Sequence, residues 1–211
     1  MATRSSIGIL YPDCSVRHIY CHSDGYPSHN GVKLQEHWAD QKKVERLLNG
    51  GSISILGSVI GKKHDFEWRT AFREDHEGDF RKPDGTTDWE KYYEAMEADP
   101  RSAYTRFYKR DRGDTGVEAL LSPFWSDNYA YDYAYLWCSQ RAFWIVGIWD
   151  ANGLKWRKLT DVLALGKERG KWEHNMDDDG FVLRSTNPID LYPPSPEREA
   201  AAAALEAVAL L

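Results

Sequence analysis

The change of hydrophobic period around Tyr20–Gly31 is the feature that most limits how this chain can fold. Before it, Ile7 and Ile9 alternate with small residues, and Val16–His22 alternates again after the turn residues 11–15. After it, the apolar residues follow helical spacing. Apolar residues at every second position are typical of strands, and those at every third or fourth position are typical of helices. The sequence therefore predicts a β-hairpin followed by a helix, with a polar turn between them.

The alternation also predicts which side chains share a face of this hairpin. Antiparallel pairing of Ile7 with Ile19 places both on the buried face, together with Ile9 and Cys21. The opposite face then carries polar and aromatic side chains, and a carboxylate follows where the second strand ends. These residues are Arg4, Ser6, His18, Tyr20, His22 and, at the exit, Asp24.

The next segment continues with helices and a further strand. Residues 31–40 and 41–48 have helical apolar spacing, and Asn49–Gly51 supplies a helix stop. Alternation in Ser52–Ile60 predicts a third strand. Strands and helices in this order indicate an α+β fold.

The second half of the chain begins with a charged segment at about residues 62–101. We interpret it as an inserted excursion with one short helix around Asp88–Met96, because apolar periodicity is otherwise weak there. Beyond the excursion, strands are predicted at 104–109, 129–137 and 141–149, the last two forming a hairpin, and a helix is predicted at 156–165.

Together these patterns predict an antiparallel sheet built from hairpins, with helices packed on one face. Residues 1–190 would form this single α+β domain, and residues 191–211 would form an Ala-rich C-terminal helix that starts near Ser195–Glu197. The apolar surface of that helix would dock on the domain, on a partner or on a second copy of the chain, which would make a homo-oligomer.

Composition excludes several classes of protein. The net charge is -6 and the basic residues are scattered, which disfavours duplex nucleic acid as a partner. No apolar run approaches the roughly 20 residues that cross a bilayer. Three cysteines, an odd count without a secretory signal, favour a reducing compartment, and we expect a cytoplasmic protein. No cofactor is implied.

The polar face of the first hairpin has the chemistry of an anion site. Arg4 offers a planar fork of donors beside two imidazoles and a phenol, which suits phosphate or carboxylate. The alternatives are a solvent-exposed face or a structural Arg4–Asp24 pair. The loop of residues 110–114, with its alternating charges, could form a second wall of this anion site. The alternative is that its charges only pair with one another in salt bridges. The candidate ligand-binding residues are Arg4, Ser6, His18, Tyr20, His22, Asp24, Tyr26, Arg110 and Arg112.

Catalytic and metal sites find less support. His18 and His22 lie roughly 13 Å apart along a strand, too far to share one metal ion. Cys21 and His22 are adjacent, so their side chains point to opposite faces of the strand. We therefore predict no catalytic residue and no metal ligand. Tyr129, Tyr131, Tyr133 and Tyr135 share a strand face, which indicates core packing or, as the alternative, a stacking platform for a base.

Residues Thr3–Ser5 and Tyr20–Pro27 carry a resemblance to a group of small phage and prophage proteins of unknown function. Those proteins begin with Thr-Arg-Ser and carry the motif Tyr-x-His-Trp-Asp-Gly-Tyr-Pro, where this chain has Ser23 in place of the tryptophan. Residues 108–113 and 131–137 also resemble the second half of that group. The resemblance covers most of residues 1–160 and implies a mobile-element origin and a role against host defence, without supplying an active site.

Three functions remain open at this point. The first is a phage-type accessory protein that binds and sequesters a small anionic ligand such as a cyclic nucleotide. The second is a protein inhibitor of a host defence complex such as a CRISPR effector. The third is a small phosphodiesterase-like hydrolase that uses His22. The absence of a recognisable nucleophile, base and orienting group favours the first two, acting in the host cytoplasm.

Overall fold

The computed structural model describes residues 2–76, 78–124, 126, 129–150 and 153–169, and it has the predicted α+β architecture. An eight-stranded sheet runs in the order β4-β3-β2-β1-β6-β7-β8, and β5 pairs with β2 as well. The strands are β1 Ser5–Leu10, β2 Ser15–Cys21, β3 Ile53–Ile55, β4 Arg106–Phe107, β5 Leu120–Pro123, β6 Tyr133–Cys138, β7 Phe143–Asp150 and β8 Gly153–Lys158.

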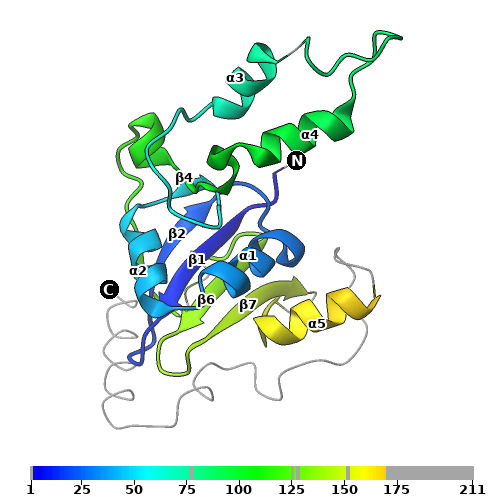
Figure 1. Ribbon diagram of the computed structural model, residues 1–211. Helices are drawn as coiled ribbons and strands as arrows, with labels where there is room; N and C mark the ends of the chain where they lie inside the picture. The colour runs from blue at the N-terminus through cyan, green and yellow to red at the C-terminus, as the bar shows by residue number, and fades with distance from the viewer. Residues whose placement is uncertain (1, 77, 125, 127–128, 151–152, 170–211) are drawn as a thin grey trace.

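Helices α1, α2 and α5 lie on one side of this sheet, while α3 and α4 stand beyond its end (Figure 1). The helices are α1 Val32–His37, α2 Gln41–Asn49, α3 Trp68–Asp75, α4 Trp89–Ala98 and α5 Leu159–Arg169. Three short helical turns complete the described elements: η1 Pro27–Gly31, η2 Pro100–Ala103 and η3 Tyr108–Arg112.

The N-terminal hairpin has the register that the sequence predicts. Ile7 is the partner of Ile19, and Ser6 is the partner of Tyr20. Ile7, Ile19 and Cys21 are buried in the main core, so the face with Tyr20 lies on the side of the sheet away from α1 and α2.

The sheet is mixed and not wholly antiparallel. The pairs β1–β2, β6–β7 and β7–β8 are antiparallel, as expected of consecutive hairpins. However, β1–β6 and β2–β3 are parallel. Parallel neighbours need a long crossover connection, and the segment between β2 and β6, which contains the helices and the excursion, provides it. The sequence pattern of each hairpin does not specify how the hairpins join.

The main core lies between the sheet and the three covering helices. Leu34 of α1, Leu47 of α2 and Val162 of α5 are buried in it against Ile7 of β1 and Tyr135 of β6. This is the stripe of apolar residues that a helix on a sheet requires. A second cluster, which includes Leu136 and Ile145, forms on the opposite face of the sheet.

The predicted third strand is shorter than its pattern suggests. Only Ile53–Ile55 pairs in the sheet, and Gly57 then passes against the chain at 103–105. A Cβ atom at Gly57 would lie 2.3 Å from the Ala103 carbonyl oxygen, so this approach requires glycine. Trp38 donates from Nε1 to the Gly57 carbonyl oxygen at 2.9 Å, which holds the bend against α1.

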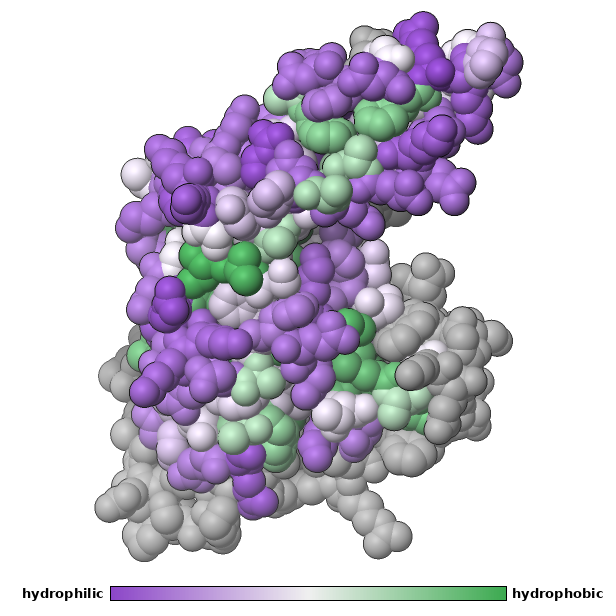
Figure 2. Space-filling model, viewed as in Figure 1, coloured by the Kyte–Doolittle hydropathy of each residue, from purple (hydrophilic) through white to green (hydrophobic). Residues whose placement is uncertain are grey.

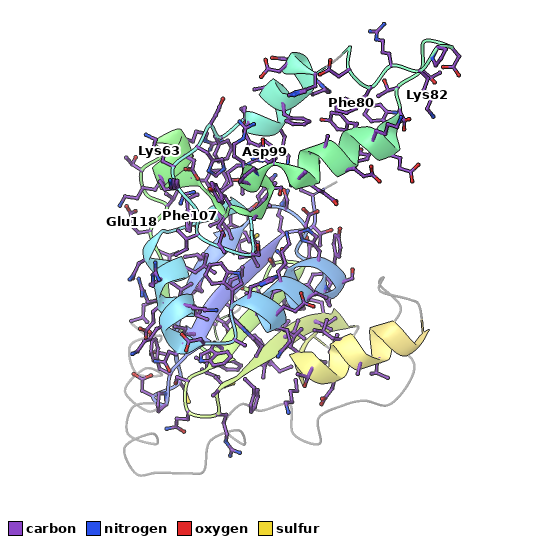
Figure 3. The ribbon with its side chains drawn as sticks, in the orientation of Figure 1. Lys63, Phe80, Lys82, Asp99, Phe107 and Glu118 are labelled. Carbon is purple, nitrogen blue, oxygen red and sulfur yellow. The ribbon has the colours of Figure 1, made fainter. Side chains whose placement is uncertain are left out.

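The excursion contains two helices, whereas the sequence predicts one. Trp68 and Phe72 of α3 pack with Tyr92 of α4 in a small core of their own. Phe80 lies between the two helices and Lys82 lies at the far tip (Figure 3). The four-residue spacing of Trp68 and Phe72 was the available signal for α3, but charged neighbours obscured it. The face of the excursion seen in Figure 2 is mostly hydrophilic.

The predicted helix at 156–165 is a strand followed by a helix. Residues Gly153–Lys158 form β8 on β7, and α5 begins at Leu159. Leu154 and Trp156, two positions apart, both pack in the second core, as alternating residues of a strand do. The helical spacing of apolar residues begins only at Leu159. Among the described residues, no helix is long and apolar enough to cross a membrane. The predicted C-terminal helix at 191–211, with the oligomer contact assigned to it, lies outside the described residues.

Candidate functional site

The polar face of the first hairpin borders a pocket of about 350 Å³. Arg4, His18, Tyr20 and His22, which the sequence placed on one face, all line it. The remaining lining residues are Ile19 of β2 and residues that precede or begin β3, β5 and β6: Ser52, Gly116, Glu118, Leu120 and Tyr131. We call this the sheet-face pocket.

The backbone of Arg4 is fixed while its side chain is free to bind. Its N–H donates to Asp132 Oδ2 at 2.7 Å, and its carbonyl oxygen accepts from the Tyr133 N–H at 3.3 Å. The residue is exposed, and its guanidinium makes no hydrogen bond or ion pair within the described part of the chain. The Arg4–Asp24 pair, which was one of the alternatives to an anion site, does not form.

The charge balance of the sheet-face pocket favours an anion. Glu118 is its one lining carboxylate among the described residues, and Glu118 pairs with Lys109 at 2.9 Å. This pairing holds the pKa of Glu118 below its usual value. Arg4 has no such partner. The Asp132 carboxylate accepts from the Arg4 backbone N–H, and the guanidinium itself makes no ion pair with a described side chain, so its donors are available to an anion.

Two aromatic side chains and an imidazole form the wall beside Arg4. The Tyr20 and Tyr131 ring centroids lie 4.8 Å apart with a tilt of 58°. The Tyr20 hydroxyl lies 2.8 Å from His22 Nδ1. Burial raises the pKa of Tyr20, so the phenol keeps its proton at neutral pH. When this phenol donates to Nδ1, the proton of a neutral His22 sits on Nε2 and is available to a ligand.

His18 does not carry the positive charge that a histidine in an anion site could supply. It is buried, its Nε2 lies 3.0 Å from Ser122 Oγ, and its ring packs on Tyr129 with centroids 5.2 Å apart. Burial lowers the pKa of His18 from 6.5 to about 4. His18 is therefore a neutral wall of the pocket at physiological pH and does not add positive charge.

The depressed pKa of His18 predicts a loss of stability in mild acid. Protons bind the unfolded imidazole below about pH 6.5 but the folded one only near pH 4, so stability is full above pH 6.5 and falls toward pH 4. Urea unfolding at pH 7.0, 5.5 and 4.5 measures this slope. His18→Gln, which cannot titrate, is expected to flatten it. An unchanged slope in the variant would assign the effect to other groups.

Three further predicted residues lie outside the sheet-face pocket. Ser6 is fully buried beneath this face, and its Oγ has no hydrogen bond partner. Asp24 has a left-handed backbone (φ 57°) and acts electrostatically on His29 and Lys33. Tyr26 packs against the main core. Ser6 is on the predicted face but is covered, whereas Asp24 and Tyr26 lie beyond the end of β2, where strand alternation no longer predicts the direction of a side chain.

Much of the Tyr20–Gly31 motif is structural. Asn30 is fully buried and donates from Nδ2 to Cys21 Sγ and to the Ser23 carbonyl oxygen, both at 3.3 Å. The Gly25 N–H donates to the Thr3 carbonyl oxygen at 2.9 Å. A Cβ atom on Gly25 would lie 2.8 Å from the Arg4 carbonyl group. These contacts hold the end of β2 against the start of β1, and so they position Arg4.

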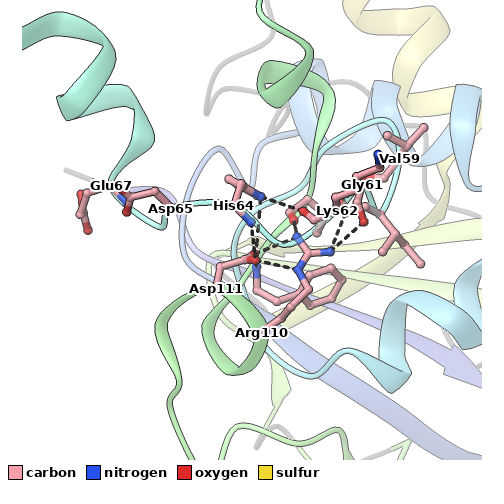
Figure 4. Close-up of polar contacts among 11 residues, drawn as sticks. Val59, Gly61, Lys62, His64, Asp65, Glu67, Arg110 and Asp111 are labelled. Carbon is pink, nitrogen blue, oxygen red and sulfur yellow. Dashed lines mark hydrogen bonds and ion pairs between the residues drawn. The ribbon is translucent and has the colours of Figure 1, made fainter. Parts of the chain in front are cut away.

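Arg110 is a structural clamp and not an anion-binding wall (Figure 4). Its guanidinium makes five hydrogen bonds: two to Asp111, and one each to the carbonyl oxygens of Ile60, Gly61 and Thr105. An arginine has five N–H donors, so none remains for a ligand. This corrects the prediction for Arg110.

Arg112 is also committed to internal contacts. Its Nε donates to both carboxylate oxygens of Asp114, at 2.9 and 3.0 Å. Its guanidinium carbon lies 4.6 Å from the centre of the Tyr108 ring and 4.8 Å from that of Phe66. The loop is thus salt-bridged, which was the alternative interpretation.

The structure adds residues that the sequence did not assign to the site. Tyr131 lines the sheet-face pocket, whereas Tyr129, Tyr133 and Tyr135 are buried in the cores. The prediction that the four tyrosines share one face is therefore wrong: Tyr133 and Tyr135 lie in the main core, Tyr129 lies in the second cluster on the opposite face, and Tyr131 faces the pocket. Glu118 and Ser52 also reach the pocket. Glu118 comes from a segment without a regular pattern, and Ser52 begins the predicted third strand, whose neighbour in the sheet the sequence did not specify.

The described residues show no catalytic arrangement around His22. Cys21 points into the core, and burial raises its pKa from 9.0 to about 11, so it remains a thiol. No group of three histidine, cysteine or acidic side chains in the described residues could hold a metal ion. In comparisons with known proteins, no family model, no curated protein and no solved structure matches the chain.

Proposed function

We propose that the protein binds a small anionic ligand of nucleotide-like chemistry in the sheet-face pocket without changing it chemically. The observation that carries this proposal is the guanidinium of Arg4, which is unpaired within the described residues and lies beside two aromatic rings. Arginine matches the geometry of a phosphate group, and tyrosine rings stack on bases. A pocket of about 350 Å³ falls in the range of small-molecule sites.

Each wall of the pocket has a part in this binding. The ligand phosphate would pair with Arg4 and accept a hydrogen bond from His22 Nε2. Its base would pack against Tyr131. His18, neutral at physiological pH, would contribute shape and a polar edge. No step in this scheme breaks a bond.

The biological role follows from the resemblance to phage proteins. In a host cell, a protein of this kind would sequester a nucleotide immune signal and so suppress the defence that the signal triggers. Sequestration requires tight binding and slow release but no turnover.

A nucleotide panel tests this proposal by thermal stability. A cyclic or linear nucleotide at a hundredfold excess over Kd should raise Tm by roughly 5–10 °C. Arg4→Ala and Tyr131→Ala should abolish the shift, while Arg141→Ala, which removes an exposed arginine elsewhere, should retain it. The ligand recovered after denaturation should be unchanged.

Two outcomes would overturn the proposal. A recovered ligand that is hydrolysed would indicate the hydrolase alternative. A panel without any thermal shift would instead favour a protein-blocking function. For that alternative, Trp89 and Tyr93 on α4 are candidate contact residues, because these large aromatic side chains are 54% and 52% exposed.

A further inference from the structure

A second group of cations lies where the excursion meets the edge of the sheet. Arg106 of β4 is only 8% exposed, and its Nε is enclosed without a hydrogen bond partner. Arg69 of α3 also has an enclosed Nε without a partner. No hydrogen bond or ion pair from either guanidinium to another described residue is present. Buried arginines are normally paired, because an unpaired buried charge is costly.

Aromatic rings support these guanidiniums without neutralising them. The Arg106 guanidinium carbon lies 5.4 Å from the centre of the Phe66 ring, and that of Arg69 lies 5.8 Å from the Trp68 ring. Phe66, Trp68 and Arg69 belong to one short stretch of chain, which brings the two arginines to the same place. Ring faces hold a cation in position but leave its N–H donors unused.

Lys33 of α1 extends this group. Its Nζ donates to the Leu56 carbonyl oxygen at 3.0 Å, which uses one of the three donors of an ammonium group. Burial and then the charge of Arg69 lower the pKa of Lys33. Burial and then Arg69 lower the pKa of Arg106 as well. Ile55, which precedes Leu56, pairs with Arg106 across β3 and β4, so Lys33 and Arg106 approach the same short segment of chain, and Arg69 acts electrostatically on both.

Nearby carboxylates do not compensate for this repulsion. Glu67, Asp65 and Asp111 act on Arg106, and Asp24 acts on Lys33, but none forms an ion pair with either cation. Asp111 is already held by Arg110. For both Lys33 and Arg106, burial and the charge of Arg69 lower the pKa by more than the carboxylates raise it, so the pKa of each group remains lowered.

We propose that Lys33, Arg69 and Arg106 form a binding site for a phosphate group. Two planar guanidiniums and an ammonium can together offer more donors than a carboxylate can accept, and a phosphate dianion carries more negative charge and more acceptor oxygens than a carboxylate. The site shares no residue with the sheet-face pocket, and the inference goes beyond the proposed function.

The test measures Tm against inorganic phosphate at constant ionic strength, with chloride as the balancing anion. Phosphate should raise Tm in a saturable way, by roughly 5–10 °C at a hundredfold excess over Kd. Arg106→Met should abolish the rise, and it should also increase Tm without phosphate because it removes an unpaired buried charge. Arg141→Met, a control at an exposed arginine, should keep the phosphate response and leave Tm unchanged.

Further measurements distinguish a phosphorylated small molecule from free phosphate, and a second variant covers the case in which the first does not fold. In the Arg4→Ala variant, which lacks the phosphate contact of the sheet-face pocket, adenosine monophosphate that binds more tightly than phosphate, with adenosine inactive, would indicate a phosphorylated small molecule; equal affinities would indicate free phosphate. Arg69→Met provides a second variant if Arg106→Met does not fold, and Arg4→Ala should leave the phosphate response intact. No saturable response, or a response that both methionine variants retain, would overturn the proposal.

Discussion

Replacing Arg110 with alanine is expected to destabilise the protein by about 3–5 kcal/mol, because it would leave the Asp111 carboxylate buried without its cation. The Asp111 side chain is fully buried, and Arg110 Nε donates to its Oδ1 at 2.7 Å. The same guanidinium holds the carbonyl oxygens of Ile60, Gly61 and Thr105, which would lose their donors. The free energy of unfolding in urea measures the effect.

Arg112→Ala is the matched control for this prediction. Arg112 also forms an ion pair, with Asp114, but in an exposed position two residues away. Exposed pairs contribute little to stability, so this variant should unfold close to the parent midpoint. If both variants lost the same stability, the clamp assigned to Arg110 would be wrong.

Truncating Tyr135 to alanine should cost about 3–5 kcal/mol, comparable to the loss of another large buried aromatic side chain. Tyr135 is fully buried in the main core, and its hydroxyl donates to the Gly25 carbonyl oxygen at 2.7 Å. The variant therefore removes both core volume and the contact between β6 and the Tyr20–Gly31 motif. Urea unfolding again provides the measurement.

Tyr135→Phe separates the two contributions. It keeps the ring and removes only the hydrogen bond, which should cost about 1–3 kcal/mol because a buried carbonyl group loses its donor. Hydrogen exchange at Gly25 should accelerate in this variant. Tyr131→Ala, at a tyrosine that is 39% exposed, should have little effect on stability. A large loss for Tyr131→Ala and none for Tyr135→Phe would contradict these assignments.

The sequence predicts those features that depend on short-range periodicity. Strand alternation fixes which residues share a face, so Ile7 and Ile19 were placed in the core and Arg4, Tyr20 and His22 were placed together on the other side. The alternation of successive strand residues also separates Cys21 from His22. These predictions needed no knowledge of the distant chain.

Features that depend on distant contacts were not predictable in this way. Arg110 has its role because the carbonyl oxygens of residues 60 and 61 arrive beside it, and nothing in residues 110–114 encodes their arrival. The charge state of His18 depends on burial under β5 and Tyr129. The parallel pairing of β1 with β6 likewise depends on the path of the whole intervening chain.

The position of β1 at the centre of the sheet has a consequence during synthesis of the protein. Its first contact with the second hairpin, Arg4 to Asp132, spans 128 positions. At 5–20 residues per second, a ribosome needs roughly 6–25 s to make that length of chain. Throughout this interval one edge of the apolar strand β1 has no neighbour, and an unpaired edge of this kind recruits other chains. Translation speed and chaperone supply should therefore set how much of this protein escapes aggregation in the cell.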